Sequence, residues 1–175
     1  MPPRTVATSM TLLKTRLKEA GAGLHGVKGP KALARLLKKQ PGPLWLEDHP
    51  WLRQATRELE NLKVVPQFAG TTWAPEAHTA VTVGLGAIPE TGTVLVRLGL
   101  EASAWLPLRA RKHMILIPHN LANLSLAEGL YLSGQGAGMV TWLTGPTRTA
   151  DIEKVLVLGA QGPEELAVVL YQPEE

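Results

Sequence analysis

The stretch of residues 139–165 constrains the fold more than any other part of this chain, because it joins an apolar run to a dense polar turn. Residues 139–143 predict a buried strand, which the turn formers Gly145 and Pro146 end. Thr149 then begins a predicted short helix that has two acidic residues in its first turn. A strand that leads directly into a helix is typical of α/β proteins, so the stretch favours that fold class.

The polar groups of this stretch are expected to lie beyond the carboxyl end of a strand. Open α/β sheets bind ligands at that edge, and hydroxyl groups, free helix amides and Arg148 together suit an anionic ligand. Asp151 has two interpretations of equal weight, a general base or a helix-capping acid, whereas Glu153 favours the structural role. A turn that only caps a strand and a helix accounts for the same spacing, so both interpretations stay open.

Residues 90–93 form a second hydroxyl-rich turn. It lies between a predicted strand at residues 80–83 and a predicted strand that begins at residue 93 and ends at residue 96. If residues 81–83 and 139–143 form neighbouring strands, the two turns face one cleft that holds three carboxylates and an arginine. The candidate catalytic residues of this cleft are Glu90 and Asp151. The candidate ligand-binding residues are Thr91, Gly92, Thr93, Gly145, Pro146, Thr147, Arg148, Thr149 and Glu153.

The rest of the chain alternates predicted helices with short apolar strands. The helices are expected over residues 6–17, 31–39, 51–62 and 121–132, and the strands over residues 44–46, 64–65, 114–117 and 165–171. Residues 26–30 predict a turn-rich link, and residues 67–75 predict a loop in which Trp73 is suited to stack on a ligand. This order predicts a mostly parallel sheet that is covered by helices on both faces.

Length and charge exclude several classes of protein. The 175 residues are enough to bury roughly 70% of the unfolded surface, so one domain over residues 1–175 is expected. The net charge is only +3 and the basic residues are dispersed, which gives no reason to expect a nucleic-acid partner. No apolar run approaches the ~20 residues that cross a bilayer, so we expect a cytoplasmic protein without membrane insertion.

The sequence offers no recognisable cofactor or metal site. It has no cysteine, which excludes cysteine-ligated iron–sulfur clusters from this chain. The motif Gly84-Leu85-Gly86 lacks the third glycine of a dinucleotide fingerprint, and a strand is expected after it where that fingerprint needs a helix. The five histidines have no close metal-ligand spacing, and His119, directly after a predicted strand, is the best catalytic candidate among them. We therefore expect no cofactor and no metal.

Two segments resemble a known family. Residues 145–153 have the form G-P-[ST]-x-T-A-D-I-E and are followed, after a short apolar segment, by G-x-x-G-P at residues 159–163. Residues 87–93 have the form A-I-A-[DE]-T-G-[ST], with Pro89 in place of the usual small residue. Over about residues 76–172 the chain resembles the LUD (lactate-utilisation) domain, in particular lactate-utilisation protein C, with Gln161 where a histidine is usual.

The resemblance implies a fold like that of glucosamine-6-phosphate deaminase, ribose-5-phosphate isomerase and the CoA transferases. It also implies a component of an L-lactate oxidation system, in which iron–sulfur partner proteins transfer electrons and this chain supplies an anion site or an assembly surface. The alternatives are a stand-alone enzyme or a sensor that binds a phosphorylated, carboxylated or CoA-linked small molecule. Whether the chain is itself an enzyme stays open at this point.

Overall fold

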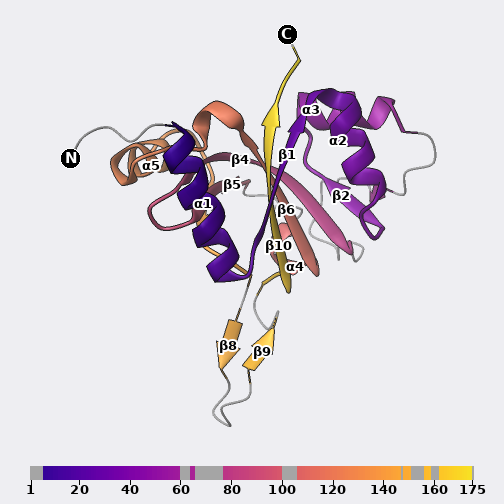
Figure 1. Ribbon diagram of the computed structural model, residues 1–175. Helices are drawn as coiled ribbons and strands as arrows, with labels where there is room; N and C mark the ends of the chain where they lie inside the picture. The colour runs from indigo at the N-terminus through magenta and orange to yellow at the C-terminus, as the bar shows by residue number, and fades with distance from the viewer. Residues whose placement is uncertain are drawn as a thin grey trace.

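The computed structural model describes residues 6–59, 64–65, 77–99, 106–146, 148–150, 156–158 and 162–174. Within these residues, the strands form one eight-stranded sheet and a separate two-stranded hairpin. Figure 1 shows the sheet nearly edge-on between two layers of helices, with the hairpin projecting from one end. The predicted α/β class with a mostly parallel, doubly covered sheet is confirmed.

Six strands of the sheet run parallel to one another. In spatial order they are β1 (Gly23–Lys28), β10 (Glu165–Gln172), β6 (Lys112–Pro118), β4 (Thr79–Ile88), β2 (Leu44–Leu46) and β3 (Val64–Val65). The antiparallel part consists of β5 (Thr93–Leu98), which pairs with the second half of β4, and β7 (Met139–Leu143), which pairs with β5. The carboxyl ends of the parallel strands point to one edge, where such sheets bind ligands.

Each face of the sheet has its own apolar core. Helix α1 (Val6–Ala20) covers one face, and helices α2 (Gly29–Lys38) and α3 (Pro50–Arg57) cover the other (Figure 1). Strand β6 serves both cores by alternation, because Ile115 and Ile117 join the α1 side while Met114 and Leu116 join the α2 side. Among the described helices, none has the length and apolar character needed to span a membrane.

The helix boundaries follow local chemistry. Helix α2 starts after an extended Lys28 with a proline in its first turn, and α3 starts at a proline after His49, whose Nδ1 accepts a hydrogen bond from Trp51 N. The helix predicted over residues 121–132 is shorter, because Ser125 and Glu128 form a capping box that begins α5 (Leu126–Ser133). A 3-10 turn over His119–Leu121 (η2) precedes it, and helix α4 covers Leu106–Arg109.

Strand β1 was not expected, because the sequence predicted a turn-rich link at residues 26–30. The strand contains two glycines, and its exposure pattern has no clear alternation, so its own sequence carries little strand signal. It forms because β10 offers a complete parallel partner, with Gly23 opposite Ala167 and Lys28 opposite Gln172. Tertiary pairing outweighs local propensity here.

The signature segment, which is the stretch of residues 139–165, differs from its prediction in two ways. Residues 139–143 form a strand, but every residue of β7 is at least partly exposed, since β7 lies at the border of the described sheet. The helix predicted to begin at Thr149 is wrong for the residues described: Arg148–Ala150 forms β8, which pairs antiparallel with β9 (Leu156–Leu158). The branched and apolar residues of these two segments favour a hairpin over a helical first turn.

A buried histidine lies near the amino end of strand β6. His113 of β6 is fully buried, and its Nε2 lies 2.8 Å from Thr82 Oγ1 of β4. Its Nδ1 is buried and has no hydrogen-bond partner. Burial lowers the pKa of His113 from 6.5 to about 3, so the ring is neutral in the native protein at ordinary pH.

We predict that His113 contributes to acid sensitivity. Below pH 6.5 the histidine of the unfolded chain takes up a proton, whereas the native ring stays neutral down to about pH 3, so the free energy of unfolding falls as the pH falls through this window. The contribution reaches at most about 1.4 kcal/mol per pH unit. Urea titrations between pH 7 and 4 should therefore show a shallower decline for His113→Gln than for the wild type. The exposed His25→Gln is the control, and equal slopes in the two variants would contradict the prediction.

Candidate functional site

The turn at residues 90–93 lies beside the end of β7, after which the second hydroxyl-rich turn begins. They are joined through β5, because Val94 at its start pairs with Ala87 of β4 on one side and with Leu143 of β7 on the other. Thr91 Oγ1 donates to Thr93 Oγ1 over 2.7 Å, and Thr93 Oγ1 lies 3.0 Å from Thr144 Oγ1. A chain of three hydroxyl groups thus links the turn at residues 90–93 to the end of β7. Residues 81–83 and 139–143 are not neighbouring strands, because β5 lies between β4 and β7, so the condition set for one shared cleft is not met.

Helix α1 packs tightly over this meeting point, and two signature glycines make that approach feasible. Gly92 has φ +67°, and a Cβ added there would lie 2.6 Å from Arg16 Cβ. A Cβ added to Gly145 would lie 2.8 Å from the carbonyl oxygen of Ala20. Thr93 is buried beside them. These contacts give the two glycines a structural role, and ligand binding by this cluster stays a prediction.

We predict that Gly92→Ala lowers the free energy of unfolding by about 2 kcal/mol or more. The substitution forces a side chain into a left-handed backbone conformation and against Arg16. Gly26→Ala is the matched control, since a Cβ at Gly26 meets nothing within 4 Å. Urea unfolding of both variants measures the difference, and a Gly92 variant as stable as the Gly26 variant would contradict the account.

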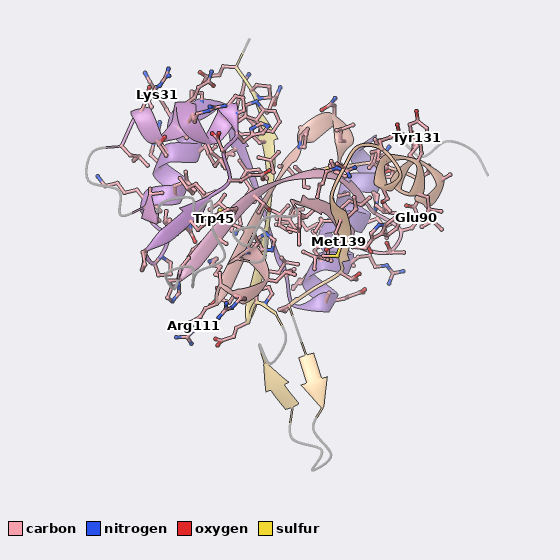
Figure 2. The ribbon with its side chains drawn as sticks, turned by 180° about the vertical axis from the view of Figure 1, so that it is seen from behind. Lys31, Trp45, Glu90, Arg111, Tyr131 and Met139 are labelled. Carbon is pink, nitrogen blue, oxygen red and sulfur yellow. The ribbon has the colours of Figure 1, made fainter. Side chains whose placement is uncertain are left out.

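The remaining candidates of the two turns are placed only in part. Glu90 and Thr91 are exposed, and Figure 2 shows Glu90 on the side of the molecule away from Lys31 of α2. Pro146 is half-buried after β7, and Arg148 and Thr149 contribute backbone to β8. The following lie outside the described residues: Thr147, Asp151, Glu153, Gln161 and Trp73.

A pocket of about 800 Å³ lies at the carboxyl edge of the parallel sheet. Strands β1, β10 and β6 end there side by side, because Lys28 pairs with Gln172 and Tyr171 pairs with Pro118. The lining residues are Lys28, His119, Asn120, Gln172, Pro173 and Glu174. The pocket thus occupies the position at which open α/β sheets bind ligands.

Apart from the acid Glu174, the lining of this pocket suits a negatively charged ligand. Lys28, His119 and Asn120 are exposed, and in the described part of the chain their side chains make no hydrogen bond or ion pair. Helix α2 starts directly after Lys28 with no side-chain cap, so its first amides and its dipole add positive potential. Among the described residues, no three histidine or acidic side chains converge in a way that could hold a metal ion.

Sequence reasoning singled out His119 but missed the rest of the pocket. Lys28 fell in the predicted link, and Glu174 fell beyond the last predicted strand, at residues 165–171. Their positions depend on the pairing of β1 with β10, which no local pattern in residues 23–28 announces. One pattern in the sequence did indicate this edge of the sheet. The apolar residues 114–117, which predict a strand, are followed directly by the polar residues His119 and Asn120 after Pro118.

A second acidic group lies at the same edge, outside this pocket. Glu47 follows β2, its backbone N–H donates to Val81 over 2.9 Å, and its Oε2 accepts from Val83 N over 2.6 Å. Burial raises the pKa of Glu47 above 4.5, an effect that the Val83 hydrogen bond opposes and the negative charge of Asp48 reinforces. The residue fastens the end of β2 to β4.

We predict that Glu47 makes the protein relatively less stable as the pH rises. The native carboxyl keeps its proton to a higher pH than the unfolded one, so the stability it contributes is full below pH 4.5 and is lost as the pH rises through the raised pKa. The stability of the wild type relative to Glu47→Gln should therefore decrease from pH 4 to pH 7. Glu58→Gln, which alters an exposed acid, should show no such trend.

Comparisons with known proteins agree with this architecture. The family model of the LUD domain matches residues 74–171. A search of curated proteins gives no match. The crystal structure of a DUF162 family protein from Deinococcus radiodurans is similar, with a TM-score of 0.65 and 18% sequence identity, over 97% of this chain and 100% of that one. At that identity the match supports the fold alone, whereas the family model spans more than half of the sequence: the chain belongs to the LUD domain family.

Proposed function

We propose that this protein is a component of an L-lactate utilisation system and that its own contribution is to bind a small anionic metabolite. The LUD domain is associated with lactate utilisation, and this association is one support. The observation that carries the proposal is the pocket at the ends of β1, β10 and β6, with Lys28 and His119 in its lining. Lactate and pyruvate each carry one carboxylate, which suits a lysine ammonium group.

In this proposal the pocket recognises two parts of the metabolite. Lys28 and the uncapped start of α2 hold the carboxylate, and His119 and Asn120 offer hydrogen bonds to the neighbouring hydroxyl or carbonyl oxygen. The chain itself has no cysteine to ligate an iron–sulfur cluster. The electrons of lactate oxidation therefore pass to iron–sulfur partner proteins, and this chain supplies the metabolite site to that assembly.

The second candidate is a stand-alone enzyme or sensor for a larger anion, such as a phosphorylated or CoA-linked molecule. It is favoured by the size of the pocket, since about 800 Å³ exceeds what a three-carbon acid fills. An enzyme converts its ligand in the absence of other proteins, whereas a sensor only binds it. Binding titrations and a turnover assay on the purified chain separate these functions.

We predict that Lys28→Ala weakens the binding of small carboxylates at least tenfold, about 1.4 kcal/mol, because Lys28 is the lysine among the described residues that line the pocket. Calorimetric titration with L-lactate, pyruvate, inorganic phosphate and coenzyme A measures the effect. Lys38→Ala, which alters an exposed lysine at the far end of α2, should bind as the wild type does. The proposal fails if none of these anions binds the wild type, or if Lys28→Ala binds them equally well.

The signature turns provide the rival location for the same ligand. Arg148→Lys and Asp151→Asn test it, since both residues were candidates from the sequence. If these variants lose binding while Lys28→Ala retains it, the site lies in the signature segment. Growth on L-lactate of a strain that lacks the protein, complemented with each variant, then shows which site the cell uses.

A further inference from the structure

The carboxyl group of Glu174 lies against the backbone of Gly29, the first residue of α2. A Cβ added to Gly29 would collide with the carboxyl oxygen, the carboxyl carbon and the Cγ of Glu174. Gly29 also has φ +75°, a conformation that other residues rarely adopt. Because Gly29 has no side chain, the carboxyl group of Glu174 can occupy the space beside it.

The charge of Glu174 also acts on a neighbouring tyrosine. The pKa of Tyr171 is raised mainly by burial and additionally by the negative charge of Glu174. Tyr171 is held in place by Trp51, whose ring centroid lies 4.6 Å from its own. Glu174 thus lies between the end of β10 and the start of α2, within the lining of the pocket.

The position of Glu174 is one that attracts anions, yet the acid is only weakly held there. It lies at the uncapped start of α2 and lines the same pocket as Lys28. Among the described residues, Glu174 forms no ion pair and its side chain no hydrogen bond. A carboxylate that is held by its tether to β10, without a hydrogen bond or ion pair to the described residues, can be displaced by a second carboxylate at modest cost.

We propose that Glu174 is a built-in competitor: its carboxylate occupies the position of the ligand's carboxylate, and a small monocarboxylate binds by displacing it. The inference rests on the anion-binding function proposed above and narrows its ligand class to carboxylates. A tethered group acts at an effective concentration on the order of millimolar, so it sets a threshold that the free metabolite must exceed. Removing the charge of Glu174 lowers that threshold.

The test compares Glu174→Gln with the wild type in calorimetric titrations of acetate, L-lactate, pyruvate and inorganic phosphate. Gln keeps the size of the side chain and removes the charge, so carboxylate affinity should increase three- to tenfold. Glu164→Gln is the control: this acid pairs with Arg111 at 3.0 Å, and Figure 2 shows Arg111 at the opposite end of the molecule from Lys31 of α2. The control should bind as the wild type does.

The remaining outcomes separate this inference from the proposed function. In the double variant Lys28→Ala/Glu174→Gln the gain in affinity should disappear. Unchanged or weaker carboxylate binding by Glu174→Gln, with Lys28→Ala still impaired, overturns the competitor role and leaves the proposed function intact. A gain for phosphate without one for carboxylates also overturns it. Absence of binding to the wild type and to both single variants overturns the two together.

Discussion

The parallel pairing of β1 with β10 is the interaction on which the rest of the structure depends. It joins a strand from the first part of the chain to the last strand, and it adds β1 to the edge of a sheet that otherwise begins at β10. The ladder places Lys28 beside Gln172 and sets the start of α2 next to Glu174. Without this pairing the pocket would lose Lys28, and α1 and α2 would lose the strand that connects them.

The sequence predicted the central strands and their layering correctly because these strands carry strong apolar signals. Strands β4, β6 and β10 are buried on both faces, which a nearly continuous apolar run announces. Strand β1 was missed because its partner lies far away in the chain, so local spacing in residues 23–28 did not contain the information. Hairpin β8–β9 was missed because Thr149 and the acids after it were interpreted as the start of a helix, whereas residues 148–150 pair with residues 156–158.

The candidate site was predictable to a smaller extent. The two hydroxyl-rich turns were expected to face one cleft, and the hydroxyl chain from Thr91 to Thr144 connects the first of them only to the end of β7. The close approach of α1 to Gly92 and Gly145 could not be predicted from the sequence. A glycine that helix packing requires cannot be distinguished in a sequence from one that a ligand requires. Among the pocket residues named here, His119 was a candidate from the sequence, because it follows a predicted strand directly. Glu174 became a candidate only when the fold placed it in the pocket lining.

The β1–β10 ladder also determines how the protein resists a pulling force. The chain enters the ladder at Gly23 and leaves it at Gln172, and because the strands are parallel these residues lie at opposite ends of it. Tension between the two termini therefore loads the whole row of backbone hydrogen bonds in shear, and they must break together instead of one after another. The strands that carry the pocket are thus joined by hydrogen bonds that tension between Gly23 and Gln172 must break together.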